Sequence, residues 1–285
     1  MEFDPGEVLL VVVAIALTVL LLLLLTAHVT AIKMPNVSLG ETEKFFLSPN
    51  SGRKELFPSI HDPPTKELSV IVPSYNEEER LPLMMDEALE YLEQRQRKDS
   101  LFSYEVIVVD DGSRDETTKV ALNYSKAYGS DKVRVLTFVK NRGKGGAVKM
   151  GVLKCRGKYI LMADADGATK FADIEKVEAG LKDLQPWPDN MAISCGSRAH
   201  LEKEAIAKRS CFRTLLMYGF HFLVWFLCVR GIKDTQCGFK LLTREAAQRT
   251  FSTLHVDRCP SLDIVEILFH FEYELLQHLR SCKLY

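Results

Sequence analysis

Short apolar runs alternate with amphipathic stretches over residues 68–197, and this alternation predicts a sheet covered by helices. Five runs have the length of buried strands, at 68–73, 104–110, 133–139, 158–162 and 191–197. Apolar positions recur at helical spacing in the stretches between them, at 80–97, 115–128, 145–155 and 170–184. Strands that alternate with helices favour a largely parallel sheet with both faces covered. The predicted fold class is therefore α/β.

A different pattern opens the chain. Residues 8–25 are uncharged and consist mostly of Val and Leu, which is enough to cross a bilayer as a helix. A cleaved signal peptide, the less favoured alternative, would begin with basic residues. Here the leading residues are acidic, and the first lysine, Lys33, follows the run. We therefore expect a membrane anchor over 1–32, with the rest of the chain in the cytosol.

Two further segments lack the strand–helix alternation. Residues 33–66 mix Pro, Ser, Gly and charge without a clear period, and we interpret them as a juxtamembrane linker. Residues 214–229 are uncharged and rich in aromatics, with basic residues on both sides. This run is short for a membrane span and is typical of a helix that contacts the membrane surface; a buried core helix is the alternative.

Charge and cysteine content narrow the function classes. The net charge of −1 gives no reason to expect a nucleic-acid partner. The seven cysteines are an odd number and contain no CxxC pair, which argues against a disulfide framework or a zinc site. Free cysteines also fit a reducing compartment.

Acidic side chains follow two of the predicted strands. One strand runs into Asp110 and Asp111, and another runs into Asp164 and Asp166. The carboxyl ends of parallel strands are where α/β folds bind ligands. Carboxylates one residue apart can both reach Mg²⁺ or Mn²⁺, and such an ion usually keeps positions open for substrate phosphates. The alternative is that these residues only form turns or cap helices.

The segment Asn141–Gly146 lies between a predicted strand and a predicted helix. Its glycines expose backbone N–H groups, and Arg142 and Lys144 add positive charge, so the segment suits a diphosphate. It has neither the P-loop pattern nor the GxGxxG dinucleotide pattern, which argues against a kinase, a GTPase or a dehydrogenase.

Five motifs together resemble the GT-A glycosyltransferases of family 2. They are Pro73–Glu77, Val109–Ser113, Asn141–Gly146, Asp164–Gly167 and Gly196–Arg198. The residues after Asp166 and the segment Asp234–Lys240 resemble, within that family, the dolichyl-phosphate β-glucosyltransferases of the endoplasmic reticulum.

The resemblance implies a GT-A, Rossmann-like sheet and a membrane enzyme of the endoplasmic reticulum. The implied reaction moves glucose from UDP-glucose to dolichyl phosphate, with inversion at the anomeric carbon, for protein N-glycosylation. Another polyprenyl-phosphate transferase with a mannose or N-acetylglucosamine donor stays open as an alternative. The implied domains are an anchor (1–32), a linker (33–66), a nucleotide-sugar domain (67–208), a membrane-contacting acceptor segment (209–258) and a tail (259–285).

The resemblance also implies roles for individual residues. The donor would contact Pro73, Tyr75, Glu77, Val109, Asp111, Arg142, Gly143, Lys144, Asp164 and Ala165. Asp164 and Asp166 would hold Mg²⁺ or Mn²⁺. Catalysis would depend on Asp166, Arg198 and Lys240, with the two basic residues meeting the phosphates of donor or acceptor.

The resemblance stops after Arg258. Residues 259–285 differ from the family's continuation, although apolar residues from Ile264 to Leu279 keep helical spacing. A second hypothesis follows, in which the chain keeps the nucleotide-sugar site but is a non-catalytic variant.

Overall fold

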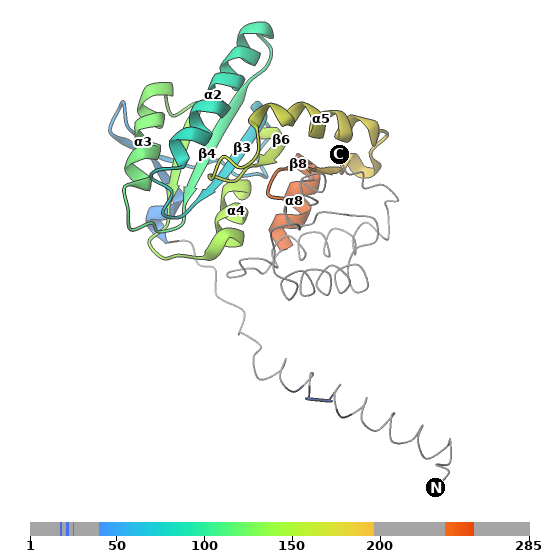
Figure 1. The fold of residues 1–285 in the computed structure, drawn as a ribbon, viewed down its shortest axis with the longest axis horizontal. Coiled ribbons are helices and arrows are strands. Elements are labelled where there is room, and N and C mark those ends of the chain that lie inside the picture. Colours follow the sequence, from blue (N-terminus) through green and yellow to red (C-terminus); the bar gives the residue numbers. More distant parts are fainter. Residues whose placement is uncertain (1–17, 19–20, 23–24, 26–39, 197–236, 254–285) are drawn as a thin grey trace, which may run out of the picture. The chain divides into compact units, whose positions relative to one another are not determined.

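The computed structural model describes residues 18, 21–22, 25, 40–196 and 237–253 (Figure 1). The chain divides into two units, residues 1–37 and 38–285. Most of the expected anchor, the apolar run 214–229 and the tail 259–285 lie outside the described residues. Within the described part, no helix has both the length and the apolar composition of a membrane span.

A six-stranded sheet forms the centre of the second unit, with strand order β5-β4-β3-β6-β8-β7. Its strands are β3 (Lys66–Ser74), β4 (Tyr104–Asp110), β5 (Val133–Thr137), β6 (Gly157–Met162), β7 (Ile193–Cys195) and β8 (Lys240–Thr243). Strands β3 to β6 pair in parallel, whereas β8 runs antiparallel between β6 and β7. The largely parallel sheet is confirmed; the insertion of β8 was not predicted.

Helices cover both faces of this sheet (Figure 1). Helices α2 (Leu81–Lys98), α3 (Thr117–Tyr128) and α5 (Ile174–Asp183) pack on one face, and α4 (Gly143–Leu153) and α8 (Arg244–Thr253) pack on the other. Two short 3₁₀ turns, η2 (Phe171–Asp173) and η3 (Pro188–Asn190), flank α5. Successive residues of a strand point to opposite faces. Val70 therefore lies in the core under α2, α3 and α5, and Ile71 lies in the core under α4 and α8. Burial on both faces explains the continuous apolar runs in the sequence.

A small hairpin precedes the sheet in the range that we interpreted as a linker. It consists of the 3₁₀ turn η1 (Glu41–Lys44) and the antiparallel strands β1 (Phe45–Ser48) and β2 (Arg53–Leu56). Phe46 and Phe57 are buried in the α4/α8 core, with their ring centroids 5.0 Å apart. The hairpin is therefore attached to the sheet unit through buried side chains, although all four residues of β2 are exposed. The sequence pattern did not predict this hairpin, because β1 has only four residues and buries only every second one.

Candidate active site

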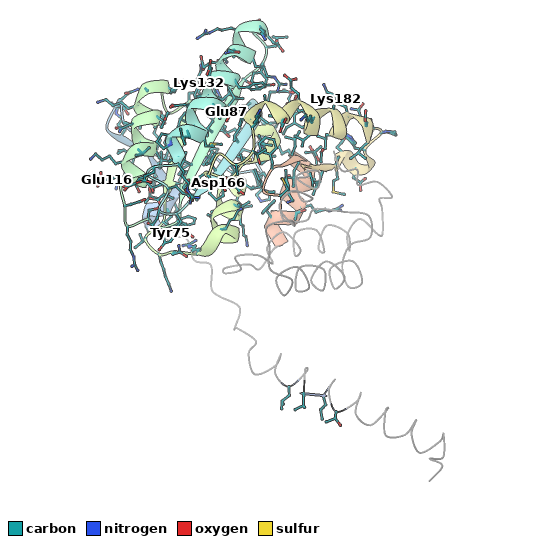
Figure 2. The ribbon with its side chains drawn as sticks, viewed as in Figure 1. Tyr75, Glu87, Glu116, Lys132, Asp166 and Lys182 are labelled. Atoms are coloured by element: carbon teal, nitrogen blue, oxygen red, sulfur yellow. The ribbon has the colours of Figure 1, made fainter. Side chains whose placement is uncertain are left out.

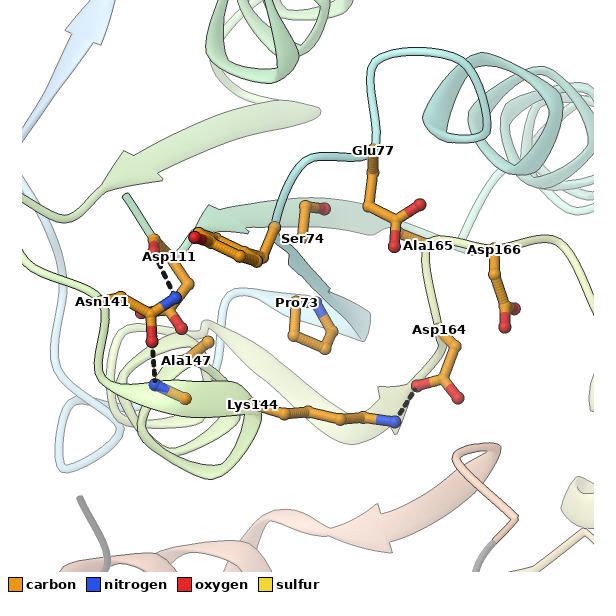
Figure 3. A pocket seen from close by; sticks show the side chains of 12 residues that line it. Pro73, Ser74, Glu77, Asp111, Asn141, Lys144, Ala147, Asp164, Ala165 and Asp166 are labelled. Atoms are coloured by element: carbon orange, nitrogen blue, oxygen red, sulfur yellow. Dashed lines mark hydrogen bonds and ion pairs between the residues drawn. The ribbon is translucent and has the colours of Figure 1, made fainter. Parts of the chain in front are cut away.

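A pocket of about 420 Å³ opens where several strands end (Figure 3). It lies at the carboxyl ends of β3 and β6, beside the first turn of α4. Tyr75 and Asp166 follow these strand ends on one side of the unit, while Lys132, which precedes β5, lies toward the other side (Figure 2). The pocket is lined by Pro73, Ser74, Tyr75, Glu77, Asp111, Asn141, Gly143, Lys144, Ala147, Asp164, Ala165 and Asp166.

Asp111 forms one wall of the pocket and is held by the loop that precedes α4. Its Oδ1 accepts the backbone N–H of Arg142 at 2.6 Å, and its carbonyl accepts Nδ2 of Asn141 at 3.0 Å. The Asp111 side chain is buried, and this burial raises the pKa of its carboxyl to about 6. The result is a carboxylate in a pocket, placed to accept an N–H or O–H from a ligand.

Two glycines, one after Asp111 and one at the start of α4, allow the loop before α4 to lie close to Asp111. Gly112 has φ +71°, and a Cβ there would lie 3.3 Å from the backbone nitrogen of Asn141. Gly143 begins α4 with φ +77°, a left-handed conformation that favours glycine, and donates its N–H to Oδ1 of Asn141 at 3.1 Å. Loop and helix start are thereby packed closely against the end of β4, beside the positive end of the helix dipole.

Asp164 and Asp166 line the other side of the pocket. Asp164 Oδ1 lies 2.7 Å from Nζ of Lys144, across the pocket floor (Figure 3). Asp166 Oδ1 accepts the backbone N–H of Ala168 at 2.9 Å. The two carboxylates supply hard oxygen ligands one residue apart, and Mg²⁺ is usually held by one or two carboxylates together with substrate phosphates. This donor set fits a divalent cation.

Glu77 adds a fourth carboxylate to the same pocket, after Asp111, Asp164 and Asp166. It forms an ion pair with Arg80, Oε2 to Nε, at 2.7 Å. Burial raises the pKa of Glu77 and the charge of Asp166 adds to the effect, while Arg80 opposes it. The Glu77 carboxyl therefore lies in surroundings that disfavour its charge, beside Asp166.

The family model of "Glycosyl transferase family 2" matches residues 69–251. The chain belongs to this family. It is 70% identical over 246 residues to the dolichyl-phosphate beta-glucosyltransferase of Mus musculus, covering 86% of this chain and 76% of the relative. The Homo sapiens protein of that name is 70% identical over 86% of this chain and 75% of the relative. The Drosophila melanogaster protein is 59% identical over 79% of this chain and 69% of the relative. The family predicted from the five motifs is confirmed.

The structure of this glycosyltransferase brings together most of the residues expected to bind the donor. Nine of the expected residues line the one pocket: Pro73, Tyr75, Glu77, Asp111, Gly143, Lys144, Asp164, Ala165 and Asp166. Arg198 lies outside the described residues. The individual roles of the nine in binding stay predictions.

Three of the expected residues lie elsewhere. Val109 is fully buried in β4 beneath α4, where a Cβ on Gly151 would be 2.9 Å from it. The Arg142 guanidinium turns to Glu43, 2.6 Å away, and to the ring of Phe138.

Lys240, the third, is 1% exposed in β8, where its ammonium donates to the carbonyl of Cys237. The expected contact of Lys240 with a phosphate of donor or acceptor stays a prediction. The strand β8 takes it into the sheet between β6 and β7.

Sequence reasoning also missed contributors to the glycosyltransferase site. Ser74, Asn141 and Ala147 line the pocket, and a Cβ on Gly238 would collide with the Asp164 carboxylate. Asn141 lay inside a recognised motif, so its position was a usable signal. Gly238 also lay inside a recognised segment, Asp234–Lys240, but its closeness to Asp164 depends on the pairing of β8 with β6, which that segment did not reveal.

Proposed function

We propose that this glycosyltransferase transfers glucose from UDP-glucose to dolichyl phosphate at the pocket between β3, α4 and β6. The observation that carries the proposal is the joint placement of Asp111, Lys144, Asp164 and Asp166 around one cavity, in a chain 70% identical to curated enzymes named for this reaction. The reaction takes place at the endoplasmic reticulum membrane, with residues 1–32 as anchor and the sheet unit in the cytosol.

The donor fits the pocket by its chemistry. Its nucleoside lies on the side of Tyr75 and Asp111, where an exposed aromatic ring and a carboxylate offer stacking and hydrogen bonding. Its diphosphate lies at the start of α4, where Gly143 offers a backbone N–H and Lys144 a positive charge.

Asp164 and Asp166 hold Mg²⁺ or Mn²⁺ in this proposal. The bound ion supplies Lewis-acid stabilisation of the charge on the departing diphosphate. Lys144, 2.7 Å from Asp164, neutralises one carboxylate before the donor enters and screens the diphosphate afterwards.

The transfer itself is a single displacement. An oxygen of the acceptor phosphate forms a bond to the anomeric carbon, the bond to the β-phosphate oxygen breaks, and UDP leaves with the electron pair, which inverts the configuration. The acceptor is already anionic near neutral pH, with a second pKa of about 6 by analogy with phosphoamino acids. Positioning and charge screening therefore matter more than a strong general base. Arg198 stays a proposed phosphate contact.

The test is transfer of labelled glucose from UDP-glucose to dolichyl phosphate by the full chain in detergent. We expect product with Mg²⁺ or Mn²⁺, no product with EDTA, and loss of product in Asp166→Asn. The matched control is Asp173→Asn, a half-buried aspartate paired with Lys176 outside the pocket. Product from GDP-mannose or UDP-N-acetylglucosamine in place of UDP-glucose would contradict the donor, and UDP binding without any product would favour the non-catalytic variant.

A further inference from the structure

Glu43 connects the N-terminal hairpin to the loop that walls the pocket. It lies in η1, and its side chain is only 3% exposed. Its Oε2 accepts the backbone N–H of Gly40 at 3.0 Å and Nη2 of Arg142 at 2.6 Å. A carboxylate buried to this degree depends on such partners, because an unpaired charge away from water is costly.

Arg142 carries this contact to the pocket. Its guanidinium lies 4.7 Å from the ring centroid of Phe138 while it pairs with Glu43. Its own backbone N–H donates to Oδ1 of Asp111 at 2.6 Å, and it is the N-cap residue of α4. Glu43 therefore fixes the side chain of Arg142, and the backbone of Arg142 in turn holds Asp111.

The hairpin gives Glu43 a firm support. Its strand β1 buries Phe46 in the core, and the backbone N–H of Phe57 donates to the carbonyl of Lys44 at 3.0 Å. At the far end of β1, Oγ of Ser48 lies 3.1 Å from Oγ of Ser130. These contacts hold in place the backbone of the turn that carries Glu43.

We propose that Glu43 is a positioning residue for the donor: through Arg142 it holds Asp111 and the first turn of α4 in the arrangement that binds the nucleotide diphosphate. Glu43 itself does not line the pocket. The ligand's identity rests on the proposed function, whereas the positioning does not depend on the transfer step. The physical benefit is preorganisation, since a glycine-containing loop fixed in advance loses less entropy when the ligand binds.

The test measures UDP binding to the full chain in detergent by isothermal titration calorimetry. Glu43→Gln keeps the size and the acceptor oxygen but removes the charge that holds Arg142. We expect the dissociation constant for UDP to rise about tenfold, as for other residues that orient a ligand-binding group. Glu41→Gln is the matched control, because Glu41 lies in the same turn but is exposed and pairs with Lys44; its UDP affinity should equal that of the wild type.

A double variant separates positioning from stability. Glu43→Gln alone leaves the half-buried Arg142 charge without its partner, which weakens folding as well. Glu43→Gln combined with Arg142→Met removes both charges of the pair and should bring the melting temperature back toward that of the wild type, short of it because the buried Lys154 also loses the Glu43 charge. UDP binding should stay about tenfold weaker. Wild-type UDP affinity in either variant would overturn the inference. If the wild-type chain does not bind UDP, the donor assignment falls, and the inference falls with it.

Discussion

Gly238 packs against the carboxylate of Asp164. A Cβ at position 238 would lie 2.5 Å from Oδ1 of Asp164 and nearer still to Oδ2. Lys144 holds Oδ1 from the pocket side. The carboxylate is thus confined between a glycine backbone and a lysine, and the missing side chain at position 238 helps to set its place.

Replacing Gly238 with alanine should therefore disturb the site more than the fold. The methyl group would force Asp164 to move, and we expect glucosyl transfer to fall about a hundredfold, with a loss of stability of about 1–3 kcal/mol from overpacking. Radiolabelled transfer and thermal unfolding measure the two effects. Undiminished transfer by Gly238→Ala would show that the position of Asp164 tolerates this shift.

Removal of the metal should weaken UDP binding as well as transfer. Asp164 and Asp166 together bring two negative charges to the pocket, so without a cation they repel the diphosphate. We expect EDTA to weaken UDP binding in the wild type and to have little effect on Asp166→Asn, whose transfer rate should be about 10²–10³-fold lower. Calorimetry with and without Mn²⁺ checks this. Equal metal dependence in wild type and Asp166→Asn would remove Asp166 from the metal site.

The raised pKa of Asp111 predicts a pH dependence of donor binding. Burial and the neighbouring Asp110 raise this pKa from 3.8 to about 6, against hydrogen bonds from the backbone of Arg142 and Gly143 and the charge of Arg142. The ionised form accepts hydrogen bonds from a ligand, so UDP affinity should fall by up to about tenfold per pH unit below 6.

The control for this prediction is Asp111→Asn, because the terminal phosphate of UDP also titrates at about 6 by analogy with phosphoamino acids. The difference between wild type and variant isolates the side chain, and parallel pH profiles would contradict the prediction. The same pKa shift changes folding stability in the opposite direction with pH. A carboxyl with a raised pKa contributes stability that is present below pH 3.8 and lost as the pH rises through about 6.

The hairpin should unfold together with the sheet unit. Phe57 is buried against Phe46 in the main core, whereas its neighbour Leu56 is 65% exposed. We expect Phe57→Ala to cost about 3–5 kcal/mol and Leu56→Ala less than about 0.5 kcal/mol. Chemical denaturation followed by circular dichroism distinguishes them. A separate unfolding transition at lower denaturant concentration in the wild type would show that the hairpin unfolds independently of the sheet unit.

Elements with a strong local pattern were predictable. The strand expected at 104–110 is found as Tyr104–Asp110, and the helix expected at 80–97 is found as Leu81–Lys98. These strands are buried on both faces and the helices on one, so burial leaves a continuous or periodic apolar pattern in the sequence. The closeness of the acidic strand ends at Asp111 and Asp164 was predictable from the sequence, because parallel strands place their carboxyl ends at one edge of the sheet.

Features that depend on distant pairing were not predictable. Lys240 belongs to a segment that looks like an exposed turn, yet it lies opposite Met162 on one side and Cys195 on the other. Glu43 meets Arg142 across 99 positions of sequence. No local pattern encodes such partners, so burial of these two charges becomes visible only in the folded chain.

The antiparallel strand β8 has a consequence for the segment that precedes it. The backbone N–H of Gly196 donates to the carbonyl of Phe239 at 2.9 Å, so the two points from which residues 197–236 depart and return are joined. The entropy of closing a loop grows slowly with length, by about 0.6 kcal/mol for each doubling. Gly196 and Phe239 are therefore held together by the sheet itself, and this junction costs little more for a long intervening sequence than for a short one.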